Sequence, residues 1–151
     1  MTGALIVEEA RCWLGTPYLH GTSVKGAGCD CLGLLRGVWR AVEGSEPEEV
    51  PWYSADWDEP QRKEVLLKAS ARHLRQVKLD EPSVGDVVLF RMKAGAVAKH
   101  LGIQTVVGSD AAFIHSYSGH GVVENALSKP WARRIVARFC FPSVADERNK
   151  N

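Results

Sequence analysis

The sequence predicts an α+β fold in which N-terminal helices pack on an antiparallel β-sheet. In the first half of the chain, apolar residues recur with the 3.6-residue period of amphipathic helices. After residue 82 the period changes to two, which is typical of strands with one buried face. The helical segments precede the strands, and short connectors rich in Gly, Ser and Asp join the strands. This order indicates an antiparallel meander and not a set of βαβ units.

Two helices are expected near the N-terminus. Residues 3–14 form the first, which ends before Pro17 because proline cannot continue the hydrogen-bond ladder. A loop over residues 15–30, which contains four glycines, leads into the second helix. That helix begins near Cys31 and ends at Gly44, a residue type favoured just after a helix.

A third helix is expected over residues 60–74, after an acidic loop at residues 44–60. The aromatic rings of this loop suit a wall for a substrate, a docking surface for a partner or a cover for the helices. The sequence leaves these three roles open. The rings belong to Trp52, Tyr53 and Trp57.

The strands expected after residue 82 carry apolar residues at alternate positions and are separated by turn residues. Together with the helices they make one domain over residues 1–145. The polar residues 146–151 are expected to form a disordered tail. The expected strands are residues 82–90 (with the turn that leads in), 99–106, 111–117, 121–125 and 135–141.

Composition argues against several classes of function. The 151 residues carry a net charge of +1, which gives no reason to expect nucleic acid or a membrane surface as a partner. No apolar run approaches the ~20 residues of a membrane span, and the N-terminus lacks the features of a signal peptide, so cytoplasmic synthesis is expected. Four cysteines are too few for a disulfide scaffold, and Cys12 and Cys140 are interpreted as small buried apolar residues.

Cys31 is the strongest candidate for a functional residue. It occupies the first turn of the second helix, with Asp30 before it as the expected N-cap. Backbone N–H groups and the positive end of the helix dipole favour a thiolate there, so we expect a lowered thiol pKa. A cysteine in this position, followed later in the chain by histidines, is a candidate nucleophile.

Two of the five histidines lie where they could activate that thiol. His100 and His115 fall on consecutive strands joined by a turn at residues 108–110. Because paired positions in an antiparallel hairpin have a constant sum, the two side chains should be opposite or diagonal on one face. If the helix carrying Cys31 packs against that face, His100 can take the thiol proton and His115 can orient His100.

Five short segments follow one another along the chain, namely LGTPY at 14–18, CDCLGL at 29–34, PSVGDVVLF at 82–90, KHLGI at 99–103 and FIHS at 113–116. In this order they resemble the motifs of the NlpC-type peptidases, which are papain-like cysteine endopeptidases of the bacterial cell wall. The chain looks closest to the short members that are encoded with phage tails and gene-transfer-agent particles.

The resemblance implies a papain-like NlpC-type fold and a site that needs no metal or cofactor. It makes Cys31 the nucleophile, His100 the base and His115 the polar third residue of a triad. It also places Tyr18 near the oxyanion and assigns Asp30 to the free amine of the substrate.

The substrate that the resemblance implies is a peptidoglycan stem peptide, cleaved between the γ-carboxyl of D-glutamate and meso-diaminopimelate. Family members usually carry Ser directly after the nucleophile, where this chain has Leu32, so the peptide preference stays open. A protein made without a signal peptide would not meet the wall. We therefore expect incorporation into a phage-like particle, with phage-tail or gene-transfer-agent proteins as partners.

Three other functions use the same residues. Cys29 and Cys31 with two histidines could bind zinc, although structural zinc sites space paired cysteines by more than the single residue found here. The fold could also be a non-catalytic structural part of a tail. An amidase or acyltransferase is a third alternative, because these enzymes share the thioester intermediate with peptidases.

Overall fold

The computed structural model describes residues 2–48 and 64–148. The aromatic residues Trp52, Tyr53 and Trp57 lie outside this part of the chain. The helices are α1 (Gly3–Arg11), α2 (Cys31–Val42), α3 (Val65–His73), α4 (Lys129–Ala132) and α5 (Pro142–Arg148). The strands are β1 (Ser23–Val24), β2 (Gly28–Cys29), β3 (Arg75–Val77), β4 (Val87–Phe90), β5 (His100–Val106), β6 (Ala112–Tyr117), β7 (Gly121–Ala126) and β8 (Ile135–Cys140).

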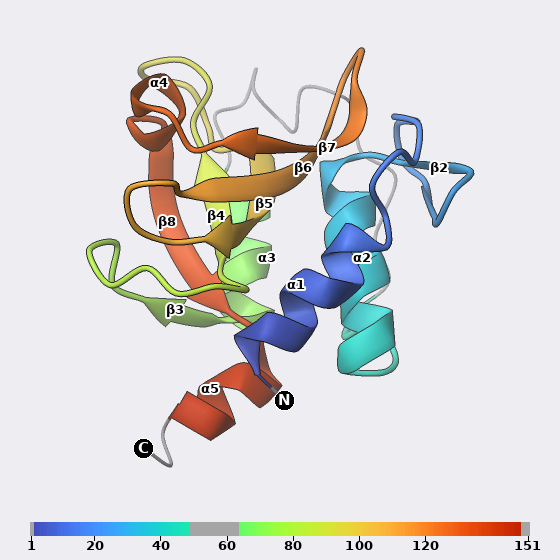
Figure 1. Ribbon diagram of the computed structural model, residues 1–151, viewed down its shortest axis with the longest axis horizontal. Helices are drawn as coiled ribbons and strands as arrows, with labels where there is room; N and C mark the ends of the chain where they lie inside the picture. The colour runs from blue at the N-terminus through green and yellow to red at the C-terminus, as the bar shows by residue number, and fades with distance from the viewer. Residues whose placement is uncertain (1, 49–63, 149–151) are drawn as a thin grey trace.

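Six strands form one antiparallel sheet in the order β3-β8-β4-β5-β6-β7, and β1 and β2 form a separate hairpin. Strands β4 to β7 are a meander, while β8 comes from later in the chain to pair with both β3 and β4. Figure 1 shows α1 and α2 side by side next to this sheet, and β8 running between α4 and α5. The predicted α+β fold, with N-terminal helices on an antiparallel sheet, is confirmed.

The two faces of the sheet carry different cores. Leu101 and Ile103 belong to a large buried cluster that includes residues of α1 and α2. Phe90 belongs to a smaller cluster on the other face, and its strand partner is His100. The condition set above for the triad, that the helix of Cys31 packs on the histidine face, is therefore not met. Both faces are apolar, so strand periodicity alone does not show which of them the helices cover.

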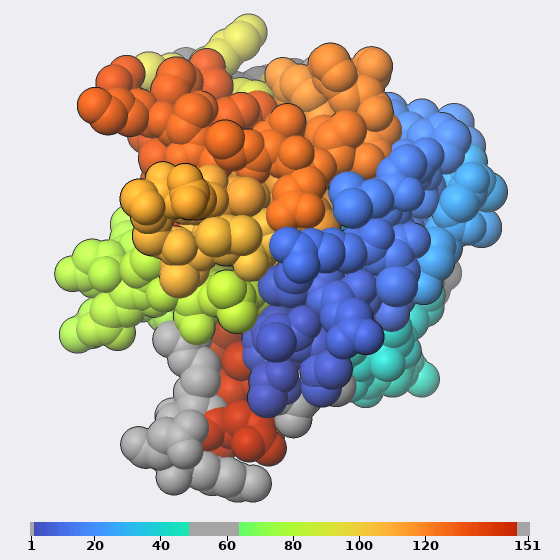
Figure 2. Space-filling model, in the orientation of Figure 1, coloured from blue at the N-terminus to red at the C-terminus, as the bar shows by residue number. Residues whose placement is uncertain are grey.

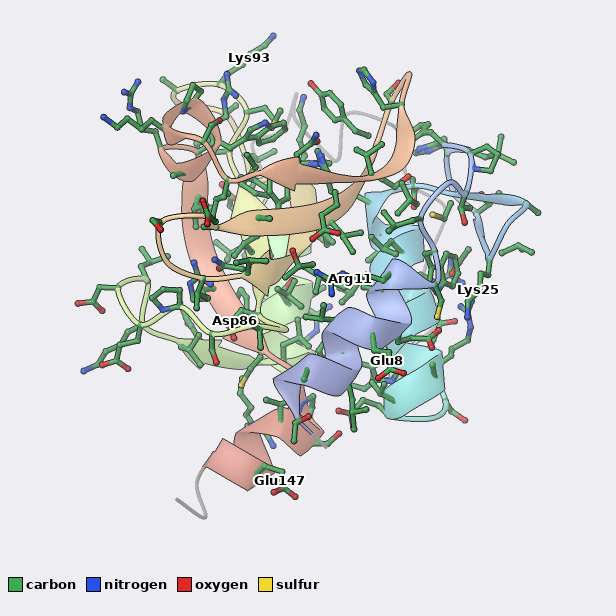
Figure 3. All side chains as sticks on the ribbon, in the orientation of Figure 1. Glu8, Arg11, Lys25, Asp86, Lys93 and Glu147 are labelled. Carbon is green, nitrogen blue, oxygen red and sulfur yellow. The ribbon has the colours of Figure 1, made fainter. Side chains whose placement is uncertain are left out.

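Helix α2 lies very close to the segment that follows α1. A Cβ atom at Gly37 would overlap the buried ring of Trp13, so this contact requires glycine. Figure 2 shows the N-terminal residues (blue) packed directly against residues of β6 and β7 (orange). Arg11 reaches from α1 toward the sheet in Figure 3, and its guanidinium pairs with Glu124 of β7 at 3.1 Å.

A buried ion pair holds the turn before β4 against two other strands. Arg138 of β8 donates to Asp86 at 3.0 Å and to the side-chain oxygen of Gln104 at 2.5 Å. Asp86 also accepts the backbone N–H of Ser83 at 2.9 Å. Removing one partner would leave the other charge buried and unpaired, which costs about 3–5 kcal/mol. The network therefore supports one register of β4, β5 and β8.

Some predicted bounds differ from the structure. Helix α1 ends at Arg11, earlier than predicted, and α3 begins at Val65, with residues 60–63 outside the described part of the chain. Strands β1, β2 and β3 and helices α4 and α5 were not predicted, and β1 and β2 lie in the segment predicted to be a loop.

The disordered tail expected from residue 146 is wrong for residues 146–148, which lie in α5. Pro142 begins this helix, and Val144 and Ala145 are buried in the main core. Residues 149–151 lie outside the described chain.

Candidate active site

The side chain of Asp30 holds Cys31 at the start of α2. As predicted, Asp30 is the N-cap, and its Oδ1 accepts the backbone N–H of Gly33 at 2.7 Å. Its Oδ2 accepts the backbone N–H of Gly21 at 2.8 Å. One buried carboxylate therefore satisfies a donor at the helix end and ties the preceding loop to the helix.

That loop passes close to the helix and then joins the sheet. A Cβ atom at Gly33 would overlap the carbonyl oxygen of Thr22, so glycine is required where the two meet. Ser116 of β6 donates to the carbonyl oxygen of Cys29 at 2.7 Å, and Tyr18 forms a backbone bridge with Cys29. These contacts bring Tyr18 and the start of α2 to the end of the sheet where β5 begins and β6 ends.

His100 and His115 are hydrogen-bonded to each other. The distance from His100 Nε2 to His115 Nδ1 is 2.7 Å. The register pairs Ile103 with Ile114, so the histidines are diagonal neighbours, as the constant-sum rule predicted. His115 Nε2 in turn lies 2.7 Å from Asn125 Oδ1. A chain of hydrogen bonds therefore runs from β5 through β6 to β7.

Aromatic rings surround the two histidines. The ring centroid of Trp131, in α4, lies 5.1 Å from that of His115 and 5.9 Å from that of His100. His115 is fully buried and His100 is 8% exposed. The bond between them is therefore kept from water, which strengthens it. Further rings within 6 Å of one or both histidines belong to Phe90, Phe113 and Tyr117.

A cavity of about 160 Å³ opens beside Cys31. Cys31 Sγ lies 3.9 Å from the carbonyl oxygen of Lys99, the residue before His100. His115 lies behind His100 and outside the cavity wall. The candidate nucleophile and base thus face one shared space. Four predicted site residues line it, namely Tyr18, Asp30, Cys31 and His100, together with His20, Met92, Lys99, Ser116, Tyr117 and Ser118.

Comparison with known proteins identifies the family. The NlpC/P60 family model matches residues 15–139, which is most of the chain. The chain belongs to the NlpC/P60 family. It is therefore a cysteine peptidase of a peptidoglycan hydrolase family.

Relatives and solved structures agree with this NlpC/P60 assignment. A probable endopeptidase of Haemophilus influenzae is 24% identical over 135 residues, covering 87% of this chain and 69% of that protein. The NlpC/p60 domain of the peptidoglycan hydrolase SagA superposes with a TM-score of 0.62 at 24% identity, over 93% of this chain and all of that domain. An NlpC/P60 family protein of Bacillus cereus gives 0.63 at 18% identity, over 91% of this chain and 39% of its own.

Burial controls the acidity of the candidate nucleophile in this NlpC/P60 chain. It raises the pKa of the Cys31 thiol to about 12, the nearby charge of Asp30 raises it further, and backbone N–H groups oppose the rise. The expectation of a lowered thiol pKa is therefore wrong. Burial, with His115 as a second cause, lowers the pKa of His100 to about 3. Thiol and imidazole are both neutral in the unliganded site.

Tyr18 and Asp30 flank the thiol with different chemistry. Burial raises the pKa of the Tyr18 phenol, and the charges of Cys31 and Asp30 add to the rise, so Tyr18 remains an O–H donor. Asp30 is 2% exposed, and each of its carboxylate oxygens already accepts one backbone N–H. His20 Nδ1 lies 3.7 Å from Asp30 Oδ2.

Sequence reasoning missed Asn125 and Trp131. Asn125 is an exposed residue of a predicted strand, yet the constant-sum rule would have found it. The register pairs Tyr117 with Gly121, which makes Asn125 a diagonal neighbour of His115. Trp131 carries no local signal, because α4 reaches the histidines only through the fold.

Leu32, the departure from the family pattern, does not line the cavity of Cys31. It lines a second hollow of about 250 Å³ between α2 and α3, together with Glu48 and Val65. The side chain at this position therefore contacts the helical layer.

Two further observations concern residues 2–48 and 64–148. Within these ranges, His, Cys, Asp and Glu side chains do not gather in a group of three or more that could hold a metal ion. Every helix there is too short or too polar to cross a bilayer.

Replacing His100 with Gln should make the protein lose less stability on acidification. Between its ordinary pKa and about 3, His100 binds a proton only in the unfolded chain, so the free energy of unfolding falls as the pH drops through this range. From pH 7 to pH 5 this histidine should account for on the order of 1–2 kcal/mol. Urea unfolding of both proteins at the two pH values measures the difference. The control variant is His120→Gln, on the exposed turn after β6. If the free energy of unfolding falls equally in wild type and H100Q between pH 7 and pH 5, His100 is not a buried neutral imidazole.

Proposed function

We propose that this chain is a peptidoglycan stem-peptide endopeptidase that uses a Cys31–His100–His115 triad. The observation that carries this proposal is the shared cavity, where Cys31 and His100 both line the wall and His115 holds His100 from behind at 2.7 Å. Membership of a peptidoglycan hydrolase family supports the substrate class.

The first half of the reaction forms a thioester. Because thiol and imidazole are both neutral at rest, the Cys31 proton moves to His100 as the sulfur attacks the scissile carbonyl carbon. The carbonyl electrons move onto oxygen to give an oxyanion. When the C–N bond breaks, the leaving amine takes the proton from His100.

The second half hydrolyses the thioester. His100 accepts a proton from water, whose oxygen attacks the thioester carbon. The C–S bond then breaks, and the sulfur regains the proton from His100. The products are a carboxylic acid, a free amine and the original thiol, and near neutral pH the acid gives its proton to the amine or to water.

Donors near the thiol can stabilise the oxyanion. Tyr18 lines the cavity as a neutral phenol, and its O–H is available to a developing negative charge. Backbone N–H groups at the start of α2 lie beside Cys31 and carry the positive end of the helix dipole. Losing either contribution would raise the barrier without preventing substrate binding.

The proposed scissile bond joins the γ-carboxyl of D-glutamate to meso-diaminopimelate. The resemblance of the motifs suggests this bond, and the cavity offers some physical support. Asp30 lines the cavity, and its carboxyl group can attract a substrate ammonium, which favours trimmed stem peptides with a free N-terminal amine. A net charge of +1 suits a small zwitterionic peptide better than a polyanion.

Triad variants should lose activity unequally. Cys31→Ala should abolish peptide cleavage, and His100→Ala should lower the rate by about 10²–10⁴ because both proton transfers are lost. His115→Ala should cost less, since an unheld base still samples the right orientation. The double histidine variant should lose less than the product of the two effects. The rate of cleavage of a stem tripeptide is measured for the three single variants and the double variant, and each is compared with wild type.

The matched control for the nucleophile is Cys12→Ala. Cys12 is an exposed free cysteine, so the interpretation of Cys12 as a buried apolar residue is wrong. The Cys12→Ala variant should retain the wild-type rate. Full activity in Cys31→Ala would remove Cys31 as the nucleophile, and multiplicative losses in the histidine pair would show that the two rings act independently.

The substrate prediction uses L-Ala-γ-D-Glu-meso-diaminopimelate, the same peptide with an acetylated N-terminus, and whole sacculi. We expect release of diaminopimelate from the free peptide, with a higher KM for the acetylated one. Asp30→Asn should raise KM for the free peptide more than for the acetylated one, because the ammonium contact weakens. Mass spectrometry of the products identifies the bond that is cleaved and measures the rates of cleavage. If neither peptide nor sacculi are cut while circular dichroism shows folded protein, the chain is a structural component instead.

We also propose that a phage-tail-like particle delivers the enzyme to the wall, on the basis of the motif resemblance to tail and gene-transfer-agent members. Particles purified from an induced producer strain should contain this protein at stoichiometric amounts by mass spectrometry. A Cys31→Ala strain should make normal particles that deliver DNA less efficiently. Particles without the protein, or full delivery by the variant, would contradict this route.

A further inference from the structure

We infer that Asn125 is a positioning residue of this site, whose side-chain oxygen selects the tautomers of His115 and His100 and leaves His100 Nδ1 to accept the thiol proton. The inference rests on the proposed function, because it assumes that His100 is the base. It adds a fourth side chain to the triad and extends the hydrogen-bond chain of the two histidines to a third strand, β7.

Asn125 lies on β7, at the outer edge of the sheet. Its backbone pairs with Phe113, and the partner of His115 is Val123, two residues earlier. This diagonal placement brings Asn125 Oδ1 to 2.7 Å from His115 Nε2. Asn125 is exposed, whereas the ring that it contacts is fully buried.

The hydrogen-bond partners dictate where the protons sit. An amide oxygen only accepts, so His115 Nε2 must carry a hydrogen. A neutral imidazole then has a bare Nδ1, which accepts a hydrogen from His100 Nε2. Neutral His100 is left with a bare Nδ1. This nitrogen is the one that the His100–His115 bond leaves for Cys31.

Without the oxygen of Asn125 the opposite arrangement becomes accessible. His115 can then carry its hydrogen on Nδ1 and donate it to His100 Nε2. Neutral His100 must in that case hold its own hydrogen on Nδ1, and a protonated Nδ1 cannot take the thiol proton. Asn125 therefore favours the tautomers in which His100 can accept the thiol proton over those in which it cannot.

The surroundings make this selection effective. Phe90, Phe113 and Trp131 pack around the histidine rings, so each polar contact acts in a medium poor in water. The hydrogen bond that His115 donates to Asn125 also opposes the lowering of the His115 pKa that burial causes, while nearby His120 adds to that lowering. A single exposed amide thus sets the protonation pattern of a buried pair.

The decisive variants differ in whether they accept a hydrogen bond. Asn125→Leu has nearly the same shape and no acceptor, and we expect at least a roughly tenfold lower kcat on the stem tripeptide with little change in KM. The loss is bounded by the ~10⁴-fold cost of a triad histidine held in the wrong tautomer. Asn125→Asp retains an acceptor and should restore most of the rate near neutral pH. The acid limb of the pH–rate profile of Asn125→Asp should move to higher pH, because the new carboxylate raises the pKa of His115 and favours its charged form.

The matched control is Ala126→Leu, at the next exposed position of the same edge strand. It should keep the wild-type kcat and pH profile. Equal losses in N125L and A126L, or a full rate in N125L, would overturn the inference. So would a failure of N125D to recover activity.

Nuclear magnetic resonance of ¹⁵N-labelled protein tests the tautomers without relying on catalysis. Wild type and N125D should show both rings protonated on Nε2, and N125L should show Nδ1 protonation. Unchanged tautomers in N125L would overturn the inference even if activity fell. If wild type cleaves no stem peptide, the proposed function fails, and the spectra still decide whether Asn125 sets the tautomers.

Discussion

The buried carboxylate of Asp30 is the constraint on which the rest of the site depends. It caps α2 through Gly33 and holds the preceding loop through Gly21, so the helix start and the loop cannot move independently. Tyr18 enters the cavity from the same loop, and Cys31 is the first residue of the capped helix. The geometry of nucleophile and oxyanion donor therefore follows from one side chain and two backbone hydrogen bonds.

The packing that fixes the thiol also makes it hard to ionise. A helix start favours an anion by about 0.3–1 kcal/mol. The rise of the Cys31 pKa from 9.0 to about 12 corresponds to about 4 kcal/mol in the opposite direction. The effect of desolvation is larger than that of the helix start, so Cys31 is a neutral thiol and His100 a neutral imidazole before substrate binds. Proton transfer accompanies attack on the substrate instead of preceding it.

The meander serves the chemistry by placing three side chains on diagonal positions of neighbouring strands. Hydrogen bonds of 2.7 Å join His100 to His115 and His115 to Asn125. Trp131 closes over this line from α4. Helices α1 and α2 occupy the opposite face, and Cys31 shares a cavity with His100 at the end of the sheet. A rigid sheet thus supports the base while a separate helix supplies the nucleophile.

Features that depend on near neighbours along the chain could be predicted from the sequence. The cap at Asp30, the start of α2 at Cys31 and the diagonal placement of His100 and His115 follow from capping and from the two-residue period of strands. The face that α1 and α2 cover, the depth at which Cys31 is buried and the contacts of His115 depend instead on the three-dimensional fold. Both faces of β5 are flanked by apolar clusters, and Trp131 reaches His115 through long-range packing. Such contacts produce no periodic pattern in the sequence, because they join residues whose separation along the chain is set by the fold.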